Sequence, residues 1–504
     1  MLTVVDLEGR FTVQGLAPGT YTLRVAAYGL ALASSTVSVA PGSTAAGPME
    51  ITLSPGARLE GHLGGPPEAS VQGEAAAPTM RGRTPGTLAA MSATRSFSCL
   101  TVKATFGPPS QVPRFAKRAR MSARAAPDFD LASVDVEGFH RELKALREQL
   151  DASLGEADAA HLRKIERWGR AATVLGVATC WMAPNPFSAA ALSLGRSTRW
   201  LLMHHVGHRG YDRVPGIPES RTGKGFAKGK RRYLDWLDWM LPEAWKFEHN
   251  VLHHSHTGED ADPDLLERNA EGTLRNPSRP LTLRYVQLAL LALTWRASYY
   301  APETLSSLRR KGRRKDGALT CAELTELVLH CYLPYAAVWF GLFPSLFLVI
   351  GPWAAFSALC NSVMADVLTS LHTFLVVGPN HTGEDLYRFD TPPEGRGARF
   401  VQQVIGSANY RTGGDLNDFA HLWLNYQIEH HLWPDLPMLK YREAQPQVRA
   451  LCEKYGIPYV QESVWTRARK MVDVVVGKSS MRRLAPRKVT AENVSTASAP
   501  APLA

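Results

Sequence analysis

The chain has 504 residues, of which 45% are hydrophobic and 20% charged, and this composition excludes a disordered or collagen-like protein. Lysine and arginine (57) outnumber aspartate and glutamate (46), which gives a formal net charge of +11. Because no zinc-finger, homeodomain or RNA-binding signature accompanies this excess, we expect no nucleic-acid partner. The six cysteines form no CxxC pair, which is typical of a reducing compartment.

Residues 1–63 alternate β-forming residues with glycine and proline turns, as in Tyr21–Val25 and Thr36–Val39, and predict a small β-rich segment. The stretches Asp6–Phe11 and Leu16–Tyr21 resemble the carboxypeptidase regulatory-like, transthyretin-like family. The resemblance implies a truncated β-sandwich without that fold's first strand.

Residues 64–133 are rich in arginine, proline and alanine, and from Ala75 to Pro127 they contain no acidic residue. Such a segment buries too little apolar area to offset its ordering entropy, so we expect a disordered linker. Residues 1–120 are then either an appendage carried on this linker or an over-extended reading frame with Met121 as its start.

From residue 134 to 470 the pattern becomes helical. Leu143, Leu146, Leu150 and Leu154 recur at three- and four-residue steps and predict an amphipathic helix. Four apolar helices then follow, at residues 169–184, 187–206, 327–350 and 352–378. The charge-free run of ~39 residues at 327–365 would form ~58 Å of helix, about twice the hydrocarbon core of a bilayer, and Gly351-Pro352 supplies the break between two spans.

The predicted fold is therefore a mainly α integral membrane protein, with about four transmembrane helices in two hairpins and a helical cap. Basic clusters at residues 221–232 and 309–315 place the cap and both termini on the cytoplasmic side. Residues 281–300 are less apolar and are expected to lie at the membrane interface. Residues 471–504 are expected to form a basic, disordered tail. Arg196 and Arg199 fall inside the second span, so that span is short or the two arginines snorkel or face protein.

Histidines form three clusters in the hydrophilic parts of this domain. The first has the form HxxxH, the second HxxxHH and the third QxxHH. On a helix, residues four apart share a face, so two imidazoles can bind one metal ion. Imidazole alone suits iron, copper, zinc or nickel. The residues are His204 and His208; His249, His253 and His254; and Gln427, His430 and His431.

The order and spacing of these clusters resemble the histidine boxes of the membrane fatty acid desaturase and hydroxylase superfamily, over residues 165–464. The third box, Asn425–Pro437, is most similar to the front-end desaturases, in which glutamine replaces the first histidine. The resemblance implies a non-haem diiron centre held by all the residues of the three boxes, and desaturation of a fatty acyl chain with O2. The substrate would be a fatty acyl lipid, acyl-CoA or acyl-ACP. With no cytochrome b5 haem motif in the chain, electrons would come from a separate ferredoxin or cytochrome b5 with its reductase.

The family also implies a ligand from the end of the fourth span. His381 is the preferred candidate and His372, nine residues earlier, is the competing one. A hydroxylase, ketolase or epoxygenase would use the same boxes. A histidine-rich metal transporter or receptor is the alternative from another class, although it predicts ionisable ligands in mid-span.

Two roles are possible for each of the histidines, carboxylates and aromatic residues beside the boxes. His205, His256, His330 and His421 are expected to be structural or to support the ligands. Five carboxylates are expected either to orient an imidazole or to be solvated, namely Glu243, Glu248, Asp262, Asp264 and Glu429. An aromatic cluster before His249 forms an interfacial belt or lines an acyl tunnel; it comprises Tyr233, Trp236, Trp239, Trp245 and Phe247.

Overall fold

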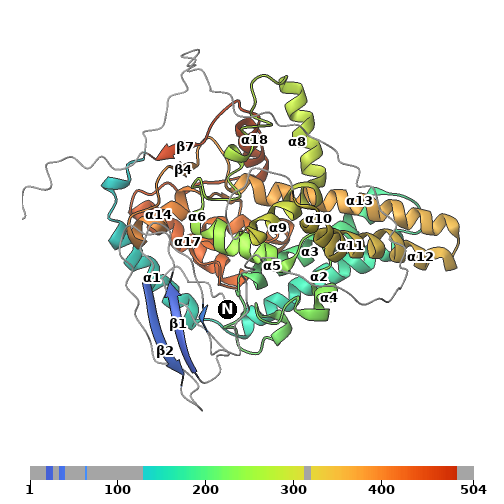
Figure 1. The fold of residues 1–504 in the computed structure, drawn as a ribbon, viewed down its shortest axis with the longest axis horizontal. Helices are drawn as coiled ribbons and strands as arrows, with labels where there is room; N and C mark the ends of the chain where they lie inside the picture. The colour runs from blue at the N-terminus through green and yellow to red at the C-terminus, as the bar shows by residue number, and fades with distance from the viewer. Residues whose placement is uncertain (1–18, 26–32, 40–62, 65–128, 311–318, 485–504) are drawn as a thin grey trace, which may run out of the picture. The chain divides into compact units, whose positions relative to one another are not determined.

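The computed structural model describes residues 19–25, 33–39, 63–64, 129–310 and 319–484 (Figure 1). The chain divides into one unit that ends at Asp128 and a second that begins at Phe129. Most of the predicted linker therefore lies outside the described residues, and its last five residues belong to the second unit. The short helix η2 (Leu131–Ser133) is the first helix of this second unit.

The described part of the N-terminal unit is a three-stranded antiparallel sheet with the order β2-β1-β3. Strand β1 (Gly19–Val25) pairs with β2 (Ala33–Val39) along its whole length and with the two residues of β3 (Leu63–Gly64). The two expected strands at Tyr21–Val25 and Thr36–Val39 thus fall on β1 and β2, whereas the remainder of the predicted β-rich segment, apart from β3, lies outside the described residues. The sandwich stays a prediction.

The second unit opens with three helices, α1 (Val136–Ala152), α2 (Glu156–Thr179) and α3 (Pro186–Gly207). The predicted amphipathic pattern is buried along α1, where Leu143, Leu146 and Leu150 face the interior. A hairpin joins α2 to α3 because Asn185 caps α3 by accepting a hydrogen bond from the Ser188 N–H, and Pro186 occupies the first helical turn.

The other hairpin follows a helical path from Cys321 to Val349, turns at Gly351 and returns along α13 (Pro352–Val377). Gly351 has φ +150°, a conformation that residues with a Cβ rarely adopt, so the predicted break is confirmed. The outgoing arm changes helix type repeatedly. Its segments are α10 (Cys321–Leu327), η7 (Val328–Tyr332), α11 (Leu333–Ala336), η8 (Ala337–Leu342), α12 (Phe343–Ser345) and η9 (Leu346–Val349).

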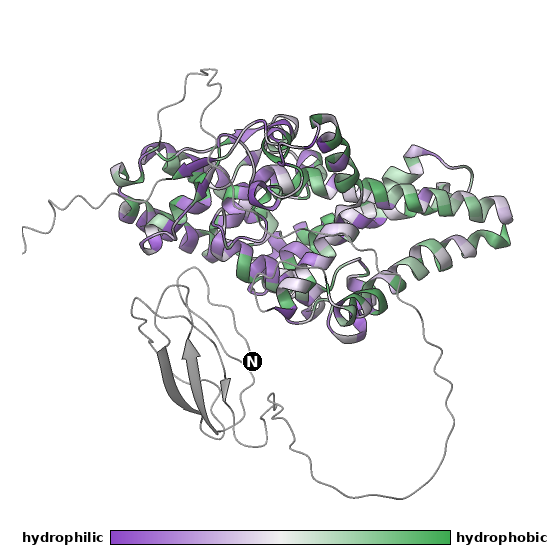
Figure 2. Cartoon of the chain, turned by 45° about the horizontal axis from the view of Figure 1, so that its top comes forward, coloured by the Kyte–Doolittle hydropathy of each residue, from purple (hydrophilic) through white to green (hydrophobic). Residues whose placement is uncertain are grey.

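Within the described residues, two stretches are long and apolar enough to cross a membrane, Cys321–Val349 and Pro352–Asn380. Figure 2 shows hydrophobic residues concentrated along the helices that project from the rest of this unit. Helices α2 and α3 occupy the positions predicted for the first two spans but fall short of the same criterion, so a four-span topology stays a prediction.

Buried arginines join the helices. Arg196 on α3 faces protein, because its guanidinium donates to the Ser362 carbonyl and hydroxyl on α13 at 2.8 and 2.6 Å. Arg199 is exposed and donates to the Leu234 carbonyl at 2.7 Å. Arg296, expected at the membrane interface, is only 1% exposed and pairs with Asp366 of α13. These pairings explain how charged residues fit among apolar helices.

The remaining elements form the cap around the ends of these helices. Its two small sheets are parallel pairs, β4 with β7 and β5 with β6. Helix α18 and β7 extend ordered structure to Leu484, beyond the predicted start of the tail at residue 471. The elements are η3 (Glu219–Arg221), η4 (Gly229–Arg231), α4 (Arg232–Asp235), α5 (Pro242–Trp245), η5 (Lys246–His253), α6 (His254–His256), α7 (Leu266–Asn269), α8 (Leu281–Trp295), η6 (Arg296–Tyr300), α9 (Ala301–Arg309), η10 (Gly378–Asn380), β4 (Tyr387–Phe389), α14 (Gly395–Ile405), β5 (Asn409–Tyr410), α15 (Asp415–Ala420), η11 (Leu424–Tyr426), α16 (Gln427–Leu432), α17 (Met438–Lys454), β6 (Gln461–Glu462), α18 (Val464–Val475) and β7 (Arg482–Leu484).

Candidate metal centre

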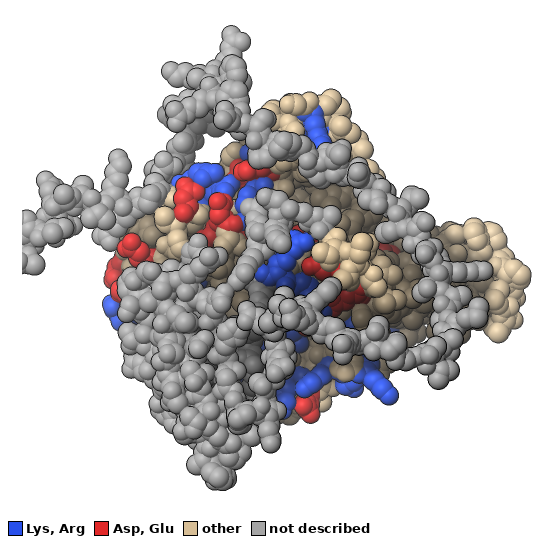
Figure 3. Space-filling model, in the orientation of Figure 1, with Lys and Arg blue, Asp and Glu red and all other residues tan. Residues whose placement is uncertain are grey.

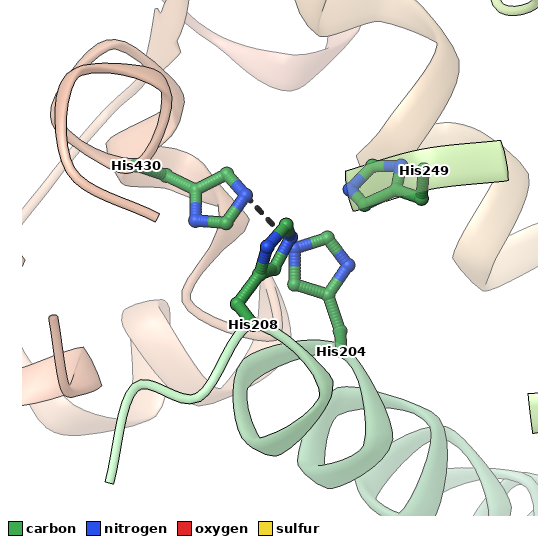
Figure 4. A group of neighbouring side chains, drawn as sticks. All are labelled: His204, His208, His249 and His430. Atoms are coloured by element: carbon green, nitrogen blue, oxygen red, sulfur yellow. Dashed lines mark hydrogen bonds between the residues drawn. The ribbon is translucent and has the colours of Figure 1, made fainter. Parts of the chain in front are cut away.

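Four imidazoles meet where α3 ends. In this first histidine group, His204, His208, His249 and His430 each offer a ring nitrogen, and these four atoms lie within 4.8 Å of one another. The Nε2 atoms of His204 and His430 are 3.0 Å apart. Figure 4 shows the four rings pointing toward one another from three separate segments, α3 with its C-cap, η5 and α16. The arrangement brings one residue or more from each of the three predicted boxes into a single group.

A second histidine group consists of His253, His381 and His431, whose ligand atoms also lie within 4.8 Å of one another. Gln427 reaches this group too, because its side-chain N–H donates to the His381 Nε2 at 2.8 Å. His254 lies between the groups, with its ring centroid 4.6 Å from that of His208 and 4.3 Å from that of His431. The two groups are therefore neighbours.

Helix geometry explains how the second box serves both groups. The segment η5 is a π-helical run, in which one turn takes in an extra residue, and such runs are frequent at functional sites. His249 and His253 stack on one face, with ring centroids 5.0 Å apart, as their spacing predicts. His249 contacts the first group and His253 the second, while His254 is turned to the space between them.

The structure separates the two candidates at the end of α13. His381 follows η10, the turn containing Pro379, and its ring lies 4.5 Å from His431. His372 lies further back on α13 and contacts the Ser197 hydroxyl at 3.1 Å and the Ala420 carbonyl at 2.6 Å. His381 thus joins the histidine groups, and His372 links α13 to its neighbours.

The donors fit a metal ion. Several ring nitrogens are buried without a hydrogen-bond partner among the described residues, which is costly unless something else binds them. Seven histidine nitrogens are orphaned in this way around the groups: Nδ1 of His204, Nε2 of His208, both nitrogens of His249 and of His254, and Nε2 of His431. Each neutral imidazole can present one nitrogen to a metal, so bound cations would satisfy one nitrogen of a ring and leave its other nitrogen as a donor.

Burial favours the form of imidazole that binds metal. It lowers the pKa of His249 to about 4 and, aided by the neighbouring imidazoles, holds the pKa of His208, His254 and His431 well below the usual range. The lowered pKa favours the neutral imidazole, which is the form whose lone pair can bind a metal. His253 differs, because burial opposes its protonation but the Asp262 carboxylate outweighs burial and raises its pKa.

Side chains outside the two histidine groups fix the orientation of several imidazole rings through hydrogen bonds. The His253 Nδ1–H donates to Asp262 at 2.8 Å, and the His431 Nδ1–H donates to Gln403 of α14 at the same distance. Tyr441 contacts the His430 Nδ1 at 3.2 Å. Such contacts leave the opposite nitrogen, Nε2, to face a metal. Neither Gln403 nor Tyr441 was expected, because both are distant in sequence from the boxes.

Two of the five candidate carboxylates approach an imidazole. Besides Asp262, Asp264 lies 3.9 Å from the His249 Nδ1 and 3.8 Å from the His253 Nδ1. Glu248 instead accepts a long hydrogen bond from the Tyr300 hydroxyl at 3.4 Å, Glu429 accepts from Asn409 and Tyr459, and Glu243 is exposed.

The other histidines have the structural contacts expected of them. His205 lies 3.5 Å from the Leu422 carbonyl, and His256 pairs with Glu259 at 3.0 Å. His330 and His421 each contact a backbone carbonyl one helical turn earlier, that of Glu326 and that of Asn417.

A largely apolar cavity of about 420 Å³ opens onto both histidine groups. Helices α8 and α13 contribute Leu288, Leu291, Trp295 and Phe374 to its wall, and Arg279 contributes a charge to its lining. The size falls in the usual range for a small-molecule site. At the histidine end, His204, His249, His253 and His381 reach the lining.

The aromatic cluster predicted before His249 does not line this cavity. Trp245 stacks on the His249 ring with centroids 4.5 Å apart, Trp239 donates to Asp366, and Trp236 donates to the Met240 carbonyl. Tyr233 is 47% exposed. The cavity's aromatic wall comes from Trp295, Tyr299, Tyr300 and Phe374, which sequence spacing does not connect to the boxes.

Comparison with known proteins decides the family. The family model of fatty acid desaturases matches residues 179–463, more than half of the chain and all three boxes. The chain belongs to the fatty acid desaturase family. The predicted resemblance is confirmed for this domain.

Named relatives of this desaturase include proteins of a bacterium and of algae. The NADPH-dependent stearoyl-CoA 9-desaturase of Mycobacterium tuberculosis is 27% identical over 355 residues, which cover 66% of this chain and 77% of the mycobacterial protein. The chloroplastic acyl-lipid (7-3)-desaturase of Chlamydomonas reinhardtii is 27% identical, with 58% of this chain and 56% of that protein covered. The Delta(8)-fatty-acid desaturase of Euglena gracilis is 29% identical, with 43% and 51% covered. The match thus spans about half the length of the algal relatives.

Proposed function

We propose that this protein is a membrane-bound, O2-dependent diiron desaturase that introduces a double bond into a fatty acyl chain. The observation that carries the proposal is the junction of an apolar cavity with two converging groups of imidazoles. Two irons bound there would reduce O2 to two waters, using two electrons and two protons from outside together with two hydrogens taken from adjacent methylene groups.

The proposed ligands are those that the boxes predict. His204, His208, His249 and His430 would hold one iron; His253, His381 and His431 would hold the other. His254 lies between the groups and would complete either coordination sphere. Gln427 contacts His381, so its amide would orient that imidazole or enter the second sphere itself.

The chain's own residues perform the remaining tasks. Leu288, Leu291, Trp295 and Phe374 would hold the acyl chain and exclude water from the histidine end of the cavity. Asp262 and Gln403 keep their imidazoles from rotating. We propose that the histidines and both termini lie on the cytoplasmic side, where the basic clusters occur and where a ferredoxin or cytochrome b5 with its reductase would deliver electrons.

We propose an acyl chain carried on a lipid, on coenzyme A or on acyl carrier protein. The relatives support this range, because their names specify a stearoyl-CoA substrate in one case and an acyl lipid in another. In the proposed domain division, residues 1–63, a linker, the desaturase domain and a basic tail are separate parts, and the desaturase domain takes in residues 129–133 of the predicted linker and the end of α18 and β7 from the predicted tail.

The test is expression in a host with a defined fatty-acid profile, followed by mass spectrometry that locates double bonds. We expect a new double bond with the wild-type chain and none with His204→Ala. Leu291→Trp should fill the cavity and suppress the product while iron is retained. Leu290→Trp is the matched control, because Leu290 is 59% exposed on another face of α8. A hydroxylated product without a new double bond, or unchanged turnover in Leu291→Trp, would contradict the proposal.

A further inference from the structure

A second cavity of about 430 Å³ lies between α2, α3 and the loop that follows α3. It shares no lining residue with the cavity at the histidine groups. Helix α2 contributes Glu166 and Arg170, α3 contributes Arg196 and Arg199, and the loop contributes Arg221. Four arginines therefore line one cavity that plays no part in the proposed desaturation.

Both carboxylates in the cavity lining already form ion pairs with arginines. Glu166 pairs with Arg221 and with Arg170, while Asp235 pairs with Arg231 at 2.8 Å and lies 3.5 Å from Arg221. The four arginines and two carboxylates of the lining leave an excess of two positive charges. That excess falls at the two arginines of α3.

Arg196 and Arg199 form no ion pair with any carboxylate in the described part of the chain. Arg196 is 7% exposed, its guanidinium lies over the Trp339 ring at 4.3 Å, and its Nε has no hydrogen-bond partner. A buried cation without an anion is costly. An anion bound in the cavity would balance the charge of these two guanidiniums.

Apart from Thr173 and Thr198, the rest of the lining is apolar or glycine. Leu192, Leu202, Phe226 and Trp339 face the cavity, and Val174 and Leu234 at its edge are 67% and 68% exposed. A site with unpaired guanidiniums beside exposed aliphatic side chains suits a ligand with an anionic head and an apolar tail.

The surroundings favour the same kind of ligand. The loop next to the cavity carries the basic cluster that was evident in the sequence, Arg221, Lys224, Lys228, Lys230, Arg231 and Arg232. Figure 3 shows basic side chains, with an acidic one beside them, at the lower edge of the described surface near the region labelled α4 in Figure 1, whereas the tip of the hairpin labelled α12 and α13 shows no charge. Basic residues at the end of membrane helices attract anionic lipid headgroups.

We propose that this cavity binds the headgroup of an anionic phospholipid, with the phosphate held by Arg196 and Arg199 and an acyl chain lying along Val174 and Leu234. Because Arg196, Arg199 and Leu202 stand on the same helix as His204, bound lipid would also hold α3 in place. The site does not depend on the identity of the metal or on the reaction at the histidine groups.

The test uses the purified full-length, metal-loaded protein in detergent. Dioleoyl phosphatidylglycerol, dioleoyl phosphatidylcholine and oleate are each titrated, and bound molecules per chain are counted by native mass spectrometry. We expect one phosphatidylglycerol per chain, bound at least ten-fold more tightly than phosphatidylcholine. Arg199→Gln should weaken that binding about ten-fold, since it removes charge-assisted hydrogen bonds to the phosphate.

Arg199→Gln is the preferred variant because Arg199 is exposed and makes one hydrogen bond to a backbone carbonyl, so folding should survive. The iron content of the variant, compared with that of the wild type, checks that its fold is intact. Arg449→Gln is the matched control, because Arg449 is an exposed arginine on α17 that pairs with Glu453 and lies outside the cavity. Equal binding by Arg199→Gln and Arg449→Gln, equal affinity for the two phospholipids, or tighter binding of oleate than of phosphatidylglycerol would overturn the proposal.

Discussion

Arg467 on α18 holds the turn that carries His381, and replacing it should release that ligand. Arg467 is fully buried. Its guanidinium donates to the carbonyls of Pro379 and Thr382, at 3.3 and 3.2 Å, on the two sides of His381. It also pairs with Asp385 at 2.6 Å. The residue therefore fixes the backbone on both sides of the proposed ligand.

The magnitude follows from these contacts. Breaking a buried ion pair costs about 3–5 kcal/mol. In Arg467→Met, Asp385 keeps Lys470 at 2.8 Å, which reduces the loss, but two buried carbonyls lose a partner, at about 1–3 kcal/mol each. With the ion-pair loss reduced to about 1–2 kcal/mol and the two carbonyls together costing about 2–6 kcal/mol, we expect a net loss of about 3–8 kcal/mol. At an unfolding entropy of roughly 2 cal/mol/K per residue, a unit of roughly 350 residues should melt about 4–11 °C lower.

Lys470→Met is the matched control. Lys470 pairs with the same two carboxylates, Asp385 and Glu462, but makes no hydrogen bond to the turn at His381. We expect it to cost about 1–2 kcal/mol and to leave iron content unchanged. In Arg467→Met, iron should fall from about two atoms per chain toward one, because the second histidine group loses a fixed ligand.

The pH dependence supplies a further check. Burial opposes ionisation of Asp385, but Arg467 and Lys470 outweigh it and hold the pKa of that carboxyl below its ordinary value. The carboxylate therefore stabilises the fold above about pH 4, and this contribution is lost as the pH falls below that value. Melting temperatures are measured from pH 7 down to pH 4 and below, and the difference between each variant and the wild type should narrow at the acid end. Arg467→Met should stay below the wild type there, because the Pro379 and Thr382 carbonyls lack the guanidinium donor at every pH. Equal melting temperature and iron content in Arg467→Met and the wild type at pH 7 would refute the reasoning.

Three more outcomes are expected. His381→Ala should lower iron content and eliminate desaturation, whereas His372→Ala should mainly lower the melting temperature; the reverse result in elemental analysis and product assay would exclude His381 as the ligand. Removing metal with a chelator should lower the melting temperature of the wild type, because a ligand bound only to the folded state stabilises it, and an unchanged melting curve would contradict a metal held by both groups. A chain that starts at Met121 should keep membrane insertion and turnover, since it retains every proposed ligand; loss of product from a well-expressed protein would show that the N-terminal segment is required.

The parts of the fold that depend on local pattern could be predicted from the sequence. The amphipathic repeat of Leu143, Leu146 and Leu150 is buried as expected, and the break at Gly351 follows from the backbone that glycine and proline permit. The spacing of His249 and His253 predicted a shared face. These inferences succeed because they need only the geometry of one helix.

Features that depend on contacts distant in sequence could not be predicted. Gln403 and Tyr441 support box-three histidines from helices that no spacing rule connects to them. Trp295 and Phe374 meet in the cavity wall only after α8 and α13 are packed. The sequence around Arg296 predicts a position at the membrane interface. In the structure Arg296 is buried, because it pairs with Asp366 on another helix.

The central claim is that two groups of imidazoles hold two irons that desaturate an acyl chain. Its most direct test is elemental analysis of purified protein whose desaturase turnover is measured on the same sample. The account predicts about two iron atoms per chain, with turnover proportional to iron content across preparations. An active preparation that contains stoichiometric zinc and no iron would contradict it.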